Sequence, residues 1–339
     1  MREAMLYEKL NNGMVRCNLC AHRCKIQAGK LGLCAVRENR EGRLHTLVYG
    51  QSISAAIDPI EKKPLYHFLP GSQAFSIATA GCNFNCSFCQ NADISQLARE
   101  GSQDWKRHSR DLPPEAVVSL AASYNCATIA YTYTEPTIFF EYAYDTARLA
   151  SRQGIKNIFV TNGFMTPELL DTIGSDLHAA NVDLKAFTNR FYKKLCGGRL
   201  QPVLDSIVKM HQLGVWVEVT TLLIPGENDD EQELGEIAGW LAALDPNIPW
   251  HISRFHPAFK MRSHPPTPVS SIHRAVEIGR AAGLNYIYTG NVPGDVYQHT
   301  VCPTCKAVTI ERSGYHVRNK LVDGNICPQC GAALTIIAG

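Results

Sequence analysis

Three cysteines in one short run, Cys82, Cys86 and Cys89, have the most specific chemistry in this chain. Their spacing is C-x3-C-x2-C, and they fall on a single loop. Cysteine thiolates ligate iron–sulfur clusters, so this run can hold three irons of a [4Fe–4S] cube. The loop has no fourth cysteine, and an iron without a protein ligand keeps a position open for substrate, as catalytic metal sites do. The run therefore predicts a cluster with an open iron. A zinc site or three unrelated buried thiols is the alternative.

The other cysteines form two further groups and two single residues. Two C-x2-C pairs near the C-terminus, with β-prone stretches between them, predict a zinc ribbon, and rubredoxin-like iron is the alternative. The N-terminal group has a spacing that leaves a structural zinc site and an auxiliary iron–sulfur cluster both open. The single cysteines are expected to be small buried hydrophobes. The C-terminal group is Cys302, Cys305, Cys327 and Cys330, the N-terminal group is Cys17, Cys20, Cys24 and Cys34, and the single residues are Cys126 and Cys196.

The composition is that of a folded globular protein of 339 residues, with 45% apolar and 19% charged residues. The formal net charge of +2 gives the whole molecule no strong field toward nucleic acid or membrane. No apolar run reaches transmembrane length, and the first residues do not form a signal peptide. Clustered thiols in such a chain indicate metal sites instead of disulfides. We therefore expect a cytoplasmic protein with no membrane partner.

Short β-branched runs alternate with helical stretches through the middle of the chain, as in βα units around a parallel sheet. A first strand is expected over 74–79, immediately before the cysteine loop, and a last one over 286–289. At least six βα repeats span about 215 residues, close to the size of an α/β barrel with its active site at the carboxyl ends of the strands. The predicted class is α/β. Further strands are expected at 128–131, 157–160, 180–184, 215–221 and 250–253, and helices at 116–124, 138–152, 231–243 and 269–282.

Polar residues that directly follow these strands are candidates to line the active-site mouth. Glu135 follows the second strand, and Asn162 follows the third. Asp183 and Lys185 alternate at the end of the fourth, so they share one side. Structural roles compete with these functional ones, because Glu135 can cap a helix and Asp183 with Lys185 can form a buried ion pair. The residues at the sixth strand could transfer protons and bind anions, or they could be surface residues whose hydrogen bonds are already made. They are His251, Arg254, Phe255 and His256.

The cysteine loop, with Phe88 as the aromatic residue before the third cysteine, resembles the radical S-adenosylmethionine (SAM) superfamily. The resemblance implies a partial (β/α)6 barrel over 71–292, with the amino and carboxylate groups of SAM on the open iron. It places Glu135 at the glutamate of a Gly-Gly-Glu motif that contacts the methionine amino group, with Tyr133 and Thr134 in place of the glycines. Asp183 and Lys185 match an Asp-x-Lys near the SAM carboxylate and ribose. The expected cofactor-binding residues are Phe88, Thr134, Glu135, Asn162, Asp183 and Lys185.

Most of the chain resembles one subgroup of that superfamily. The cysteine-rich module over 1–70 and the zinc-ribbon-like module over 293–339, with the central motifs, are similar to the pyruvate formate-lyase activating enzyme-like group, and within it to AmmeMemoRadiSam-system enzymes. The resemblance implies reductive cleavage of SAM at the [4Fe–4S] cluster to a 5′-deoxyadenosyl radical, which abstracts hydrogen from a protein or small-molecule substrate. It also implies a reductant such as flavodoxin or ferredoxin, and AMMECR1-like and Memo-like partner proteins. Zn²⁺ at the C-terminal ribbon completes the expected cofactors.

Two other functions remain as alternatives. A radical SAM enzyme that modifies RNA would use the N-terminal module and the ribbon to hold the nucleic acid, and residues 16–43 are rich in arginine and lysine. Without interleaved aromatic residues, that basic stretch is first interpreted as a solvated or cluster-neutralising face. A non-enzymatic iron–sulfur and zinc carrier or scaffold is the remote alternative, because a carrier gains nothing from an open iron.

Overall fold

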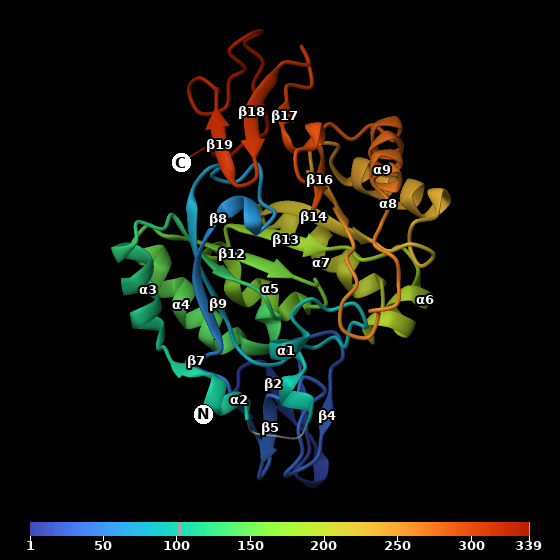
Figure 1. The fold of residues 1–339 in the computed structure, drawn as a ribbon. Helices are drawn as coiled ribbons and strands as arrows, with labels where there is room; N and C mark the ends of the chain where they lie inside the picture. The colour runs from blue at the N-terminus through green and yellow to red at the C-terminus, as the bar shows by residue number, and fades with distance from the viewer. Residues whose placement is uncertain (101–103, 339) are drawn as a thin grey trace.

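The computed structural model describes residues 1–100 and 104–338, and an eight-stranded sheet forms its centre (Figure 1). The predicted ranges 71–292 and 293–339 also include 101–103 and 339, which lie outside the described residues. Seven neighbouring strands run parallel, and β8 adds antiparallel to β9 at one edge. The order is β16-β15-β14-β13-β12-β11-β9-β8, so the sheet is open, with β8 and β16 at its two ends. The strands are β8 Ser54–Pro59, β9 Gln73–Ala78, β11 Thr128–Tyr131, β12 Lys156–Thr161, β13 Ala179–Asp183, β14 Trp216–Leu223, β15 Trp250–Arg254 and β16 Ile287–Gly290.

Helices connect the parallel strands and confirm the predicted α/β class. Local sequence fixes where several of them begin. Proline occupies the first turn of α3 and α5, where a missing N–H costs no hydrogen bond. Asp230 caps α8 by accepting hydrogen bonds from the backbone N–H groups of Gln232 and Glu233. The helices are α1 Ala92–Ser95, α2 Trp105–His108, α3 Pro114–Ser123, α4 Phe140–Arg152, α5 Pro167–Ile173, α6 Asn189–Phe191, α7 Gln201–Gln212, α8 Glu231–Leu244 and α9 Val269–Ala281, and the shorter turns are η1 Asn11–Gly13, η2 Ile60–Lys62, η3 Leu97–Glu100, η4 Pro136–Phe139, η5 Gly174–Asp176, the π-helical η6 Tyr192–Cys196 and η7 Val296–Gln298.

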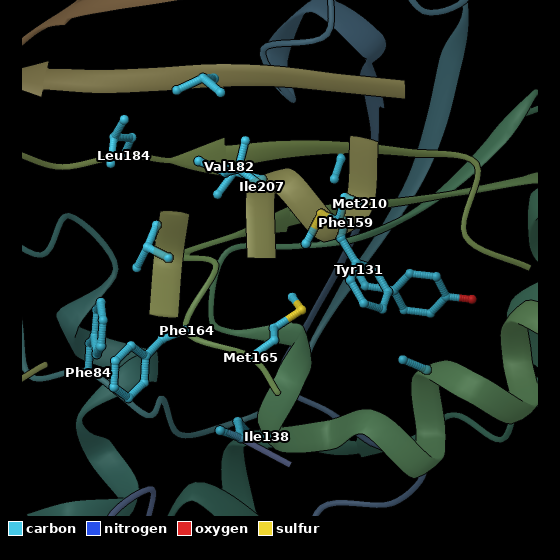
Figure 2. Packing of buried hydrophobic residues seen from close by; sticks show 14 of the residues in the cluster. Phe84, Tyr131, Ile138, Phe159, Phe164, Met165, Val182, Leu184, Ile207 and Met210 are labelled. Atoms are coloured by element: carbon cyan, nitrogen blue, oxygen red, sulfur yellow. The ribbon is translucent and has the colours of Figure 1, made fainter. Parts of the chain in front are cut away.

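The core lies between the sheet and its helices and extends toward the N-terminus. All four residues of β11 are buried, as expected for a parallel strand covered on both faces. Figure 2 shows Val182 of β13 close to Ile207 and Met210 of α7, with Phe84 of the cysteine loop beside Phe164. The same cluster contains residues from the first fifty positions, including Val15 and Leu44. The N-terminal segment is therefore packed onto the core that supports the cysteine loop.

Small antiparallel sheets form the two ends of the molecule, the N-terminal one below the central sheet in Figure 1 and the C-terminal one above it. β8 belongs to the predicted N-terminal range 1–70, yet it pairs with the central sheet. No helix of the described residues is long and apolar enough to cross a membrane. The remaining strands are β1 Arg2–Glu3, β2 Tyr7–Lys9, β3 Val15–Cys17, β4 Lys25–Ile26, β5 Arg37–Arg40, β6 Arg43–Thr46, β7 Gln51–Ser52, β10 Arg110–Asp111, β17 Thr300–Val301, β18 Val308–Ser313 and β19 His316–Asn319.

Candidate active site

The cysteine loop begins just after β9, and distant parts of the chain hold it in place. The backbone N–H groups of Asn85 and Ser87 donate to the carbonyls of Cys196 and Leu195 in η6, both at 2.8 Å. The Arg99 guanidinium donates to the Cys82 carbonyl at 2.9 Å. These bonds satisfy backbone groups that a loop without secondary structure would otherwise leave unpaired. The loop is therefore fixed at the carboxyl edge of the sheet.

Phe84 packs against Gly198, the second glycine after η6. A Cβ at position 198 would lie 2.4 and 2.7 Å from two carbons of the Phe84 ring, so only glycine fits there. The ring also lies 5.1 Å from Phe164, between ring centroids. Phe84, which lies between the first two cysteines, thus anchors the loop in the core.

The three thiols of the loop are free and lie in surroundings that suit a bound cation. Burial, followed by the negative charge of Glu135, raises the pKa of the Cys82 thiol well above its usual value. A contact with Cys196, together with burial, raises the pKa of Cys86. A metal cation would supply the positive charge that thiolates need here. The donor set therefore fits a metal–thiolate group.

One cavity of about 450 Å³ joins the three cysteines to the residues at the strand ends. Its volume is within the range of small-ligand sites. A larger cavity of about 760 Å³, lined by Trp216 and His178 among others, contains no cysteine. The smaller cavity is the candidate site because it brings the three loop thiols together with Glu135, Asp183 and Lys185 at the strand ends. All nine residues predicted for the cluster and SAM line it: Cys82, Cys86, Cys89, Phe88, Thr134, Glu135, Asn162, Asp183 and Lys185.

Glu135 is 1% exposed and joins the ends of β11 and β12. Its Oε1 accepts hydrogen bonds from the Thr137 N–H (3.1 Å), the Thr137 hydroxyl (2.6 Å) and the Thr161 hydroxyl (2.7 Å). Its Oε2 accepts from the Asn162 N–H at 2.8 Å. The bond from Thr137 caps η4, so the structural role considered for this acid is present, and the carboxylate lines the cavity as well. Oε2 keeps lone-pair capacity for one further donor.

Asp183 and Lys185 form an ion pair on one wall, with 2.8 Å between Asp183 Oδ2 and Lys185 Nζ. Burial alone would lower the pKa of Lys185, but Asp183 and the nearby Cys86 raise it well above its usual value. Lys185 therefore stays charged. Its Nζ also lies 5.8 Å from the centre of the Phe88 ring. The pair considered from sequence is real, and it borders the cysteines.

Thr134 and Asn162 mainly shape the walls. The Thr134 hydroxyl donates to the Thr79 carbonyl at 2.9 Å. The Asn162 amide donates to the Asn83 side chain at 2.7 Å and lies 3.9 Å from the Cys82 sulfur. Asn162 thus connects a strand end to the residue that follows the first cysteine.

Lys63 and Tyr133 also line the cavity, and both contact the buried Asp58 behind them; neither Lys63 nor Asp58 was predicted from the sequence. Lys63 is 1% exposed at its side chain and pairs with Asp58 at 2.7 Å. Tyr133 donates its hydroxyl to Asp58, and its ring lies 4.5 Å from Lys63 Nζ. Burial lowers the pKa of Lys63 to about 8. Tyr133 has φ +63°, a conformation that favours glycine. The presence of tyrosine at a position where the family motif has glycine was the one sequence signal that could have pointed to this group.

The residues expected after the sixth strand do not line this cavity. His251 is buried and binds Glu218, with 2.6 Å between His251 Nε2 and Glu218 Oε2. The Arg254 Nε donates to the Thr267 carbonyl at 2.7 Å, and Phe255 is fully buried. His256 is exposed. These residues stabilise the fold at the neighbouring strands.

The C-terminal cysteines converge on one point. The four sulfurs lie within 4.8 Å of one another, with 3.7 Å between Cys302 and Cys330 and 3.6 Å between Cys305 and Cys327. A tetrahedral metal with sulfur bonds of about 2.3 Å places its ligands about 3.8 Å apart. The geometry fits a single metal ion.

The arginines of the basic N-terminal stretch are all paired, whereas its Lys25 and Lys30 are exposed. Each of its arginines forms an ion pair with a glutamate, and the pair of Arg37 with Glu141 is fully buried. Five of the seven cations in this stretch are thus paired with glutamates, which lowers the net positive charge that it offers to phosphates. The other pairs are Arg16–Glu8, Arg23–Glu168, Arg40–Glu38 and Arg43–Glu3.

Comparisons with known proteins show which superfamily this chain resembles. The Radical SAM superfamily profile matches residues 76–238. The chain is 43% identical to an uncharacterized protein of Methanocaldococcus jannaschii, over 99% of this chain and 100% of that relative. It is 26% identical to a putative glycyl-radical enzyme activating enzyme of the same organism, over 54% of this chain and 68% of that relative. The crystal structure of a radical SAM methyltransferase from Sphaerobacter thermophilus has a similar fold, with a TM-score of 0.50, 18% identity, and coverage of 70% of this chain and 71% of that chain.

Proposed function

Because this chain belongs to the radical SAM superfamily and is an enzyme, we propose that it cleaves SAM reductively and abstracts hydrogen from a protein or small-molecule substrate. Superfamily membership implies a [4Fe–4S] cluster and SAM, which together supply a 5′-deoxyadenosyl radical when bound. One observation carries the proposal. The three loop cysteines line the same 450 Å³ cavity as the charged residues Glu135, Asp183 and Lys185 at the ends of β11 and β13.

In this proposal the residues of the cavity bind the cluster and orient SAM. Cys82, Cys86 and Cys89 ligate the cluster. Glu135 accepts a hydrogen bond from the amino group of SAM through the free capacity of Oε2. The positive charge of Lys185 neutralises the SAM carboxylate, and Asp183 accepts hydrogen bonds from the ribose hydroxyls. Both groups are available to one bound molecule because they lie side by side on one wall.

Other polar groups of the cavity remain for the substrate. Lys62, Lys63 and Tyr315 lie on its wall, and Tyr315 comes from the C-terminal module. Lys62 and Lys63 both pair with Asp58 at 2.7 Å, and the remaining N–H donors of their ammonium groups favour carbonyl acceptors of a substrate at this side. Tyr315 is 58% exposed, so its ring is free to contact a molecule entering the cavity.

Within the superfamily we assign the chain to the pyruvate formate-lyase activating enzyme-like group and its AmmeMemoRadiSam branch. The N-terminal cysteine motif and the likeness to a putative activating enzyme support this assignment. The assignment predicts a reductant such as flavodoxin or ferredoxin, and AMMECR1-like and Memo-like partner proteins. The C-terminal cysteines then hold one Zn²⁺ that stabilises their module, consistent with sulfurs 3.6–3.7 Å apart.

Anaerobic assay of the cysteine variants tests the proposal. Wild type reconstituted with iron and sulfide, then reduced with dithionite, should convert SAM to methionine and 5′-deoxyadenosine. The C82A, C86A and C89A variants should lose this conversion by at least about 10³-fold, because the iron loses a ligand. Cys126→Ala, at a buried thiol outside the cavity, is the control and should keep it. SAM cleavage by any of the three variants would refute the cluster assignment.

A further inference from the structure

We infer that the four N-terminal cysteines, Cys17, Cys20, Cys24 and Cys34, hold a second iron–sulfur cluster next to the first. All four line one cavity, together with apolar side chains such as Leu19 and Ile138. They come from β3, from the turn that follows it, and from the segment between β4 and β5. Backbone hydrogen bonds fix this arrangement, because the Cys17 N–H donates to the Cys24 carbonyl at 3.0 Å.

The distances between sulfurs distinguish a cluster from a single ion. Around one Zn²⁺ the four sulfurs lie about 3.8 Å apart, and the C-terminal cysteines have that spacing. No three N-terminal cysteines come within 4.8 Å of one another, and this holds across residues 1–100 and 104–338 for every other cysteine set, including Cys82, Cys86 and Cys89. An iron–sulfur cube lies between its ligands and keeps them farther apart than one ion does. Neither the N-terminal set nor the radical SAM loop therefore has the close sulfur spacing of the C-terminal single-ion site.

The space between the N-terminal cysteines supports the same choice. The cavity between these cysteines has a volume of about 20 Å³. Four sulfurs at about 2.3 Å from a single ion would leave no such space. Thiols and apolar side chains make up most of its lining, which polar residues such as Arg37 and Asn83 complete. A group larger than one ion and ligated by sulfur is what fills it.

Arg37 gives an independent sign of an anionic group in this cavity. Its side chain lines the cavity and is 2% exposed. Both terminal nitrogens pair with Glu141 at 2.8 Å, but its Nε has no hydrogen-bond partner among the described residues. A buried donor without a partner is costly, and a thiolate or sulfide sulfur would accept from it.

The two cysteine sets share a wall. A Cβ on Gly81, which precedes Cys82, would lie 3.0 Å from the Cys34 carbonyl oxygen. The His22 Nε2 lies 3.0 Å from the Asn83 carbonyl, within the radical SAM loop. Asn83 and Thr137 line the N-terminal cavity and also bond to Asn162 and Glu135 of the candidate active site. One layer of residues thus separates the two sites.

The test uses the full chain without the first cluster. The C82A/C86A/C89A variant, reconstituted anaerobically, should retain about four irons and four sulfides per chain and one zinc, with the Mössbauer spectrum of a cysteine-ligated [4Fe–4S] cluster. Adding C17A and C24A should remove that iron and leave the zinc. A triple variant that holds no iron and about two zincs would overturn the inference.

A second measurement keeps the inference testable where the triple variant fails to fold. Wild type should bind about eight irons, and the C17A/C24A variant about four. Equal iron in both would overturn the inference. Neither assay involves SAM, so failure of the proposed SAM cleavage leaves these outcomes interpretable.

Discussion

Glu135 serves the fold and the cavity with the same carboxylate, and this sharing makes its replacement informative. It accepts four hydrogen bonds from Thr137, Thr161 and Asn162, all of them buried. Alanine would leave these donors unsatisfied, at about 1–3 kcal/mol for each buried group. Loss of SAM binding in that variant would therefore combine two effects. Glutamine separates them better, because one amide oxygen still accepts.

We expect Glu135→Gln to weaken SAM binding about tenfold, which corresponds to about 1.4 kcal/mol. The negative charge is lost, and the new amide group faces the Asn162 N–H. The free energy of unfolding should fall by about 1–3 kcal/mol. Equilibrium SAM binding and denaturant unfolding on cluster-loaded protein measure the two effects. Glu233→Gln, outside the cavity, is the matched control, and unchanged SAM affinity in Glu135→Gln would show that this carboxylate does not contact SAM.

At the scale of elements, the cysteine loop depends on the turn after α6 as much as on β9. η6 receives two backbone hydrogen bonds from the loop, and Gly198 leaves room for the Phe84 ring. A methyl group at 198 would force the ring and the loop to shift. The position of the thiols therefore depends on residues more than one hundred positions away.

Gly198→Ala should lower the free energy of unfolding by about 1–3 kcal/mol, as overpacking of a core does. It should also reduce iron bound at the loop, while zinc stays unchanged. Gly239→Ala on α8 is the matched control, since a Cβ there meets nothing within 4 Å. That control should raise stability by up to about 1 kcal/mol. Normal iron binding and stability in Gly198→Ala would mean that the loop tolerates the shift.

Buried strands could be predicted from sequence, and contacts made by the edge strand could not. The seven expected strands lie within two residues of their observed positions, because runs such as 128–131 are apolar on both faces. Strand order then brought Glu135, Asn162 and Asp183 to one edge. Lys63 was missed because it follows β8, whose pairing with β9 leaves no apolar pattern. His251 was misplaced because a histidine at a strand end looks the same whether it meets ligand or Glu218.

At the scale of the whole molecule, a buried polar network joins the C-terminal module to the sheet. Arg312 of β18 donates to the Tyr66 carbonyl at 2.8 Å, and its guanidinium lies 4.1 Å from the Tyr66 ring. His67 Nδ1 donates to the Thr335 carbonyl at 2.7 Å, and its Nε2 accepts from the Tyr288 hydroxyl at 2.5 Å. In the neutral imidazole Nδ1 carries the proton and Nε2 accepts, so protonation would require the Tyr288 hydroxyl to turn and accept from Nε2.

His67 should therefore make stability fall in acid. Burial lowers its pKa to about 4, whereas histidine in the unfolded chain titrates near 6.5. Between these values the unfolded state binds the proton, so the free energy of unfolding decreases as pH drops from about 6.5 to about 4, by up to about 3 kcal/mol. Denaturant unfolding at several pH values should show this slope in wild type and a reduced one in His67→Gln. If the free energy of unfolding falls equally steeply with pH in both proteins, groups other than His67 cause the acid sensitivity.

The same network has a consequence for synthesis on the ribosome. His67 and Thr335, which bond to each other, are 268 residues apart. At about 5–20 residues per second, the first of them waits roughly 15–50 s for the second. During that time the buried polar groups at 66 and 67 lack their C-terminal partners, although β9 and the cysteine loop have already emerged. Nascent chains cannot complete this network before Thr335 is translated, so the contact between the sheet and the C-terminal module forms late in synthesis.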